Sequence, residues 1–108
     1  LEERDKHLLT DFLGKRLGGA TAVICYNDEI AYHLIQALLD TGQPVPEKVA
    51  VVSFDNSYLS QLGPVPITSL SHRSRMGRVA AEQIIALLQG GAARSKYLEW
   101  ELIARSSG

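Results

Sequence analysis

Two polar residues stand directly after short apolar segments, at the points where binding chemistry is expected. Asn27 follows the apolar run 21–26, and Asp55 follows the apolar run 49–54. In open α/β sheets ligands bind just beyond the carboxyl ends of the strands, so both residues are predicted on one rim of the sheet. An amide and a carboxylate there can hydrogen-bond a polyhydroxylated ligand, and Asp55 can accept from two hydroxyls at once.

Each candidate also has an ordinary structural interpretation. Asn27 precedes two carboxylates in the first turn of an expected helix, a pattern equally typical of a helix N-cap. Asp55 is equally suited to an Asx-turn that leads into Asn56. His72 lies at the junction between an expected strand and helix, where a single histidine is more often structural or solvated than a ligand-binding group.

Catalytic or metal-binding chemistry finds little support in the sequence. The single cysteine, Cys25, lies inside an apolar run, where a thiol is expected to be buried and unreactive. One cysteine excludes an internal disulfide and a multi-cysteine metal site. No pair of aspartates has a context that indicates a shared acid–base site, and Gly18-Gly19 follows a helix rather than the strand a phosphate loop requires. We therefore predict a protein that is not an enzyme and has neither metal nor cofactor.

Helical and apolar segments alternate along the chain, and these elements must position the candidate residues. Apolar spacing and turn residues predict helices over 2–17, 30–39 and 73–88, a short helical turn over 58–62, and strands over 21–26, 49–54, 67–70 and 97–105. The first two strands are apolar throughout, which is typical of parallel strands covered on both faces. The order predicts an α/β fold with a parallel sheet, closed by a half-exposed edge strand.

Composition restricts the class of protein. The chain has 108 residues, 11 basic and 12 acidic, with a net charge of −1, 45% hydrophobic and 21% charged residues. These values predict one soluble globular domain without a nucleic-acid-binding face of its own. The apolar runs are too short to span a membrane. A charged start and a single cysteine favour the cytoplasm, and the missing initiator methionine suggests a piece of a longer protein.

Four motifs in the chain carry a family resemblance. They are residues 21–31 (TAVICYNDEIA), 45–56 (VPEKVAVVSFDN), 66–70 (PITSL) leading into 76–78 (MGR), and 102–107 (LIARSS). Together they resemble the C-terminal part of the effector-binding domain of LacI/GalR-type bacterial transcription repressors. Tyr26 and the run 54–59 are most similar to the arabinose-responsive branch, in which a GntR-type DNA-binding head precedes a LacI-like sensor.

The resemblance implies a three-layer, parallel-sheet lobe of a type I periplasmic-binding-protein-like sensor, incomplete in this chain. Residues 1–108 would be the C-terminal portion of the sensor, without the DNA-binding head and the first lobe. Asn27, Asp55 and His72 match effector-binding positions. Tyr32 and Ile35 lie on the helix that matches a dimer interface. The implied partners are an L-arabinose-like sugar, a second copy in a homodimer or swapped oligomer, and operator DNA through the absent head.

Other functions fit the same residues. A sugar-binding protein of an uptake system would share the fold, while an α/β enzyme fragment or an α/β domain without a ligand remains a less specific alternative. One departure from the repressor pattern is Ser53, where the family usually has glycine. That change affects only the expected packing of the strand.

Overall fold

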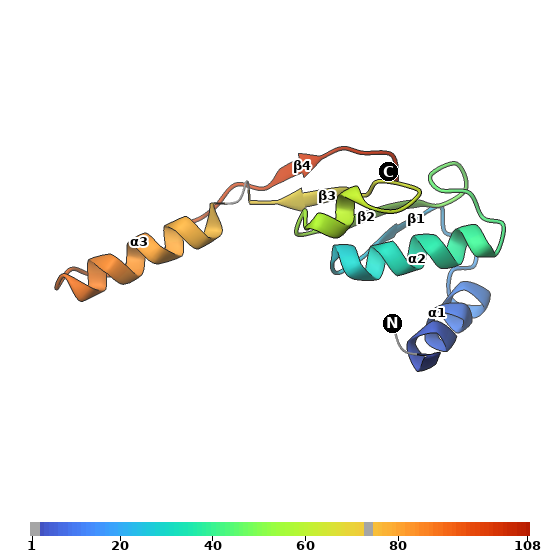
Figure 1. Ribbon diagram of the computed structural model, residues 1–108, viewed down its shortest axis with the longest axis horizontal. Helices are drawn as coiled ribbons and strands as arrows, with labels where there is room; N and C mark the ends of the chain where they lie inside the picture. The colour runs from blue at the N-terminus through green and yellow to red at the C-terminus, as the bar shows by residue number, and fades with distance from the viewer. Residues whose placement is uncertain (1–2, 73–74) are drawn as a thin grey trace.

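A computed structural model describes residues 3–72 and 75–108 of the chain. Its elements follow in the order α1 (Glu3–Lys15), β1 (Ala22–Ile24), α2 (Asp28–Asp40), β2 (Ala50–Phe54), the 3₁₀ helix η1 (Tyr58–Gln61), β3 (Thr68–Ser71), α3 (Met76–Leu88) and β4 (Glu101–Ile103) (Figure 1). Every predicted helix and strand is therefore present, although β1 and β4 are shorter than expected. The expected helix starts at residues 2 and 73 lie outside the described residues.

The four strands form one sheet in the order β1-β2-β3-β4. β1 pairs with β2 and β2 with β3 in parallel, whereas β4 returns antiparallel to β3. This arrangement confirms the predicted α/β class with a mostly parallel sheet and an edge strand at the C-terminal side. Because β1, β2 and β3 run in the same direction, the loops that follow them emerge at one edge of the sheet (Figure 1).

The core lies between one face of the sheet and α2. Apolar residues recur along α2 at helical spacing and face the sheet: Ala31, Leu34, Ile35 and Leu38. From the sheet, Val51 and Ile67 meet them, and both are at most 1% exposed. α1 lies beyond α2 on the same side and packs Leu9, Phe12 and Leu13 against the edge of this core (Figure 1).

The opposite face of the sheet is only partly covered by the described residues. The register aligns Ile24 with Val52, and Leu70 with Leu102, so these side chains share that face. Ile24 is 74% exposed and Leu102 is 59% exposed. The expectation that the first strand is buried on both faces is therefore wrong, because β1 is an edge strand with a helix on one side only. In the described residues the third layer of the expected lobe is not formed.

The segment after β4 joins β2 to the start of β3. The Val51 N–H donates to the Ser107 carbonyl (2.7 Å), and the Ser107 Oγ donates to the Val51 carbonyl (2.5 Å). On the other side, the Thr68 N–H donates to the same Oγ at 2.8 Å. Ser107 is fully buried. Its hydroxyl bridges the Val51 carbonyl and the Thr68 N–H, which satisfies both buried backbone groups.

α3 extends away from this core and gives the molecule its elongated dimensions of 58 × 29 × 23 Å (Figure 1). None of its residues is buried. Its apolar residues include Met76, Ile84 and Leu87, each more than half exposed. An apolar helix face of this size is uncommon on a stable monomer and indicates a surface that another element or chain covers.

Asn27 begins α2 and has the backbone geometry of an N-cap. Its φ and ψ are −151° and 174°, and its Oδ1 accepts a hydrogen bond from the Ile30 N–H at 2.9 Å. The N-cap interpretation of this residue is therefore correct. Asp28 and Glu29 follow in the first turn, where negative charge interacts favourably with the helix dipole.

We predict that the isolated 108-residue chain self-associates. The exposed faces of α3 and of the sheet are apolar, and burial of about 400 Å² of such area contributes roughly 10 kcal/mol before entropic costs. Light scattering at high micromolar concentration should give a mass of a dimer or larger assembly. A mass near 11.8 kDa together with a cooperative thermal transition would contradict this expectation.

We also predict that Asn27→Ala lowers the free energy of unfolding by about 1 kcal/mol, since the Ile30 N–H loses its acceptor. Asn27→Ser is the matched control, because serine is an equally good N-cap and should restore stability. Urea unfolding followed by circular dichroism measures both. Equal stability of the alanine and serine variants would show that the cap contributes nothing.

Candidate functional site

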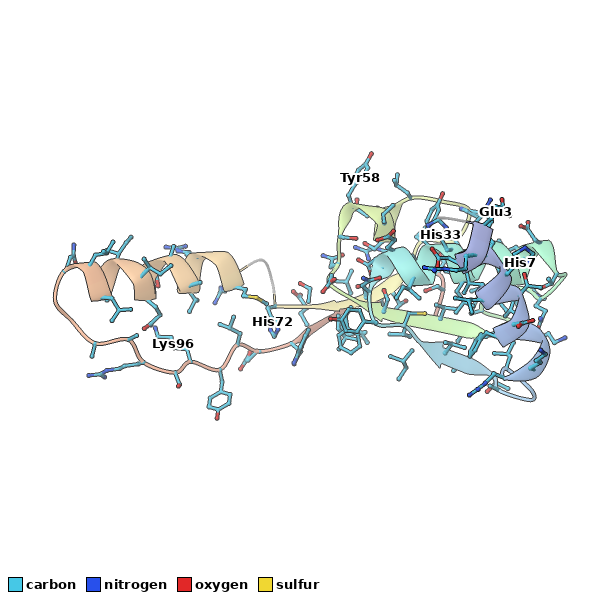
Figure 2. The ribbon with its side chains drawn as sticks, turned by 90° about the horizontal axis from the view of Figure 1, so that it is seen from below. Glu3, His7, His33, Tyr58, His72 and Lys96 are labelled. Carbon is cyan, nitrogen blue, oxygen red and sulfur yellow. The ribbon has the colours of Figure 1, made fainter. Side chains whose placement is uncertain are left out.

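A hollow of about 200 Å³ lies at the carboxyl ends of β2 and β3. Its lining residues are Asp55, Ser71, His72, Met76 and Trp100. The structure therefore brings together two of the three residues predicted to bind a ligand, Asp55 and His72. Figure 2 shows His72 where the chain leaves the sheet toward α3. This strand-end hollow is named the rim cleft below.

Aromatic rings form one wall of the rim cleft. The His72 and Trp100 rings are stacked with centroids 3.7 Å apart and planes inclined at 35°. The Phe54 and Trp100 rings meet edge-on, with centroids 5.5 Å apart. His72 Nδ1 is buried and has no hydrogen-bond partner among the described residues. A buried polar atom without a partner is uncommon in folded proteins.

Asp55 sits on a turn with an unusual backbone. Its φ is 101°, and that of Asn56 is 50°, a region in which aspartate and asparagine are enriched among non-glycine residues. The side chain of Asp55 is exposed to solvent. Such a conformation persists only where several contacts hold it, and it is often found at ligand-binding turns.

Arg105 holds this turn from the C-terminal segment. Its guanidinium donates to Asn56 Oδ1 at 2.6 Å, to Ser60 Oγ at 3.0 Å and to the Ile67 carbonyl at 2.8 Å. Its backbone N–H also donates to Thr68 Oγ1 at 2.8 Å. One arginine thus links the turn, η1 and the start of β3.

The carboxylate of Asp28 holds the same turn from the α2 side. Asp28 is 1% exposed. Its Oδ1 accepts from the hydroxyls of Ser53 and Ser69, the latter at 2.8 Å, and its Oδ2 accepts from the Ser57 N–H at 2.5 Å. Ser53, the departure noted in the sequence, is therefore accommodated in the strand as a buried hydrogen-bond donor.

Asn27 is not among the residues that line the rim cleft. It stands after β1, next to β2 in the sheet, but its side-chain oxygen is engaged at the start of α2. Trp100 lines the cleft and is absent from the sequence prediction. The register explains its position: Leu102 pairs with Leu70, so Trp100 and His72, each two residues away, reach the same face. Only knowledge of the β3–β4 pairing could have identified it.

The two residues expected at a dimer interface differ in their surroundings. Ile35 is 2% exposed and belongs to the core between α2 and the sheet, so its side chain has no surface left for a partner. Tyr32 is half-buried against the turn at Gly63. A Cβ on Gly63, whose φ is 85°, would lie 2.9 Å from the Tyr32 ring, so this contact requires glycine.

Reactive, metal-binding and membrane-spanning features were also sought in the described residues. Burial raises the pKa of the Cys25 thiol from 9.0 to about 11, which confirms the expected unreactive thiol. Within residues 3–72 and 75–108, no cluster of three His, Cys, Asp or Glu side chains is suited to hold a metal ion. No helix in those ranges is long and apolar enough to span a membrane. A second hollow of about 290 Å³ lies between α1 and α2, away from the strand ends.

Comparisons with known proteins agree with this architecture. Residues 2–108 match the periplasmic binding protein-like domain family. An arabinose metabolism transcriptional repressor of Halalkalibacterium halodurans is 37% identical over 70 residues, which cover 64% of this chain and 19% of that protein. The HTH-type transcriptional repressor CytR of Escherichia coli K12 is 32% identical over 90 residues, covering 81% of this chain and 26% of the repressor.

A solved structure shows the same fold. A LacI-type transcription regulator of Bifidobacterium animalis subsp. lactis superposes with a TM-score of 0.82 at 31% identity, covering 91% of this chain and 36% of that one. The chain thus spans well under half the length of the relatives it matches. The sheet order, the rim cleft and the match over nearly all residues lead to one conclusion: the chain belongs to the periplasmic binding protein-like domain family, and it resembles the sensor part of LacI-type regulators.

Proposed function

We propose that this chain is part of the effector-sensing domain of a sugar-responsive LacI-type transcriptional repressor in the cytoplasm. The effector binds in the rim cleft, and its chemical class is a small sugar similar to L-arabinose. Asp55 accepts hydrogen bonds from sugar hydroxyls, His72 contacts the sugar beside it, and Trp100 covers the apolar face of the ring. DNA binding belongs to a head outside these residues.

The observation that carries this proposal is the meeting of Asp55, His72 and Trp100 in one hollow. A sugar presents hydroxyls around its edge and C–H groups on its faces, so a site for it combines a charged acceptor with an aromatic surface. The hollow of about 200 Å³ is smaller than the 300–1,000 Å³ of typical ligand pockets. A second lobe facing the rim would enlarge it.

The relatives support the same class of ligand. Two of them are named arabinose metabolism repressors, at 37% and 34% identity. Among the structural neighbours, a regulator named CelR is bound to cellobiose, with a TM-score of 0.81 at 30% identity. A LacI family regulator of Arthrobacter is bound to lactose, at 25% identity. Disaccharides are thus bound by proteins with this fold, and the names of the two arabinose metabolism repressors favour an L-arabinose-like sugar here.

The proposed protein acts as a dimer, and the outer surface of α2 near Tyr32 faces the partner. A sugar that binds one arrangement of the lobes better than the other shifts the population of DNA-binding dimers. By linkage, operator DNA then changes sugar affinity by the same factor that sugar changes DNA affinity.

Asp55→Ala in the full-length protein should weaken L-arabinose binding roughly 10- to 150-fold, because a hydrogen bond to a charged group is worth about 1.5–3 kcal/mol. Alanine also disfavours the positive φ of the turn, whereas Asp55→Asn retains it and removes only the charge. The asparagine variant should therefore show a smaller loss. Isothermal titration calorimetry with L-arabinose, cellobiose and lactose measures these affinities, with glycerol as a control polyol.

Asp11→Asn on the exposed side of α1 is the matched control and should bind like the wild-type protein. Unchanged affinity in both Asp55 variants would remove Asp55 from the site. Tight binding of sugar by a protein that recognises no DNA would instead favour the uptake-system alternative.

A further inference from the structure

The carboxylate of Asp28 is buried and has no exposed surface with which to bind a ligand. Its hydrogen bonds are to the turn that carries Asp55 and to the two strands beside that turn. We propose that Asp28 is a positioning residue that acts through Ser69 and Ser57 to hold the Asp55 carboxylate in its binding geometry. The link to ligand affinity rests on the proposed function of the rim cleft.

Three successive backbone amides of the turn are held in place. The Asp55 N–H donates to the Leu70 carbonyl at 2.8 Å. The Asn56 N–H donates to Ser69 Oγ at 2.9 Å, and the Ser57 N–H donates to Asp28 Oδ2 at 2.5 Å. The first bond belongs to the sheet. The other two depend on Asp28, either directly or through the serine that it orients.

The direction of these hydrogen bonds makes the carboxylate necessary. Ser69 has one hydroxyl proton, and it donates that proton to Asp28 Oδ1 at 2.8 Å. Its oxygen is then oriented to accept from the Asn56 N–H. Ser53 donates to the same Oδ1. Three donors therefore converge on an acceptor-only group, and an amide in its place would present an N–H₂ to one of them.

The turn needs this support because of its backbone. Positive φ values at Asp55 and Asn56 are disfavoured for residues with a side chain, so the turn relaxes when its amides lose their acceptors. Arg105 holds the Asn56 side chain at 2.6 Å, which keeps the turn near the sheet. Loss of Asp28 is thus expected to shift the Asp55 carboxylate rather than to unfold the lobe.

The test combines hydrogen exchange with a double-mutant cycle in the full-length protein. In Asp28→Asn and Ser69→Ala, the amides of Asn56 and Ser57 should exchange faster relative to the β2 amide of Val52, as measured by NMR. Affinity for L-arabinose should fall about tenfold in Asp28→Asn, and this loss should shrink to less than about twofold when Asp55 is already alanine and offers no side chain to position, because coupled neighbours are not additive.

Ser107→Ala is the matched control. Ser107 is also a fully buried serine with two hydroxyl hydrogen bonds to the strands, but it contacts no residue of the turn. The Ser107→Ala substitution should lower thermal stability, and it should leave both the L-arabinose affinity and the hydrogen exchange of the turn amides unchanged. A role for Asp28 in stability alone would give the same pattern as Ser107→Ala.

Three results would overturn the proposal: unchanged turn exchange in Asp28→Asn, unchanged affinity in that variant, or an equal affinity loss with and without the Asp55 carboxylate. Failure of the proposed function is a different result. A wild-type protein that binds none of the three sugars, yet shows the faster turn exchange in Asp28→Asn, would refute the sugar assignment and support the positioning of the turn.

Discussion

A buried negative charge organises the rim of this sheet. Desolvation of a carboxylate costs several kcal/mol unless hydrogen bonds compensate for it, and Asp28 is compensated by two hydroxyls and one backbone amide. Those donors come from β2, β3 and the turn after β2, while Asp28 itself begins α2. One carboxylate therefore joins the start of the helix, two strands and a loop. Removal of any one donor leaves a charge that the interior does not solvate.

Arg105 provides the complementary positive group. Its guanidinium donates to an amide oxygen, a hydroxyl and a backbone carbonyl. The Asn56 side chain accepts a hydrogen bond from Arg105. Its backbone N–H donates to Ser69, which in turn donates to Asp28. The turn thus lies between a buried anion and a half-buried cation. Such polar networks specify one arrangement more strictly than apolar packing does, since their bonds are directional.

Local patterns in the sequence predicted most of the fold, and the errors have a common cause. Helical spacing located α2 and its cap at Asn27, and apolar runs located β1, β2 and β3. The exposure of Ile24, the place of Trp100 in the cleft and the burial of Asp28 were not predictable from such patterns. Each depends on which strands pair or on contacts across long stretches of chain, such as that between Asp28 and Ser69, which are 41 positions apart. In the sequence, Asp28 looked like any acidic residue in a first helical turn.

The Ser107 bridge has a consequence for the order in which the lobe is completed. Its hydroxyl joins the Val51 carbonyl, 56 residues earlier, to the Thr68 amide, 39 residues earlier. Contacts at such separation require closure of long loops, which slows their formation. During synthesis, β2 and β3 emerge well before the residue that completes their hydrogen bonding. In the nascent lobe, the Val51 carbonyl and the Thr68 N–H therefore lack this bridging hydroxyl until the C-terminal segment is made. The same segment carries Arg105, which binds the turn.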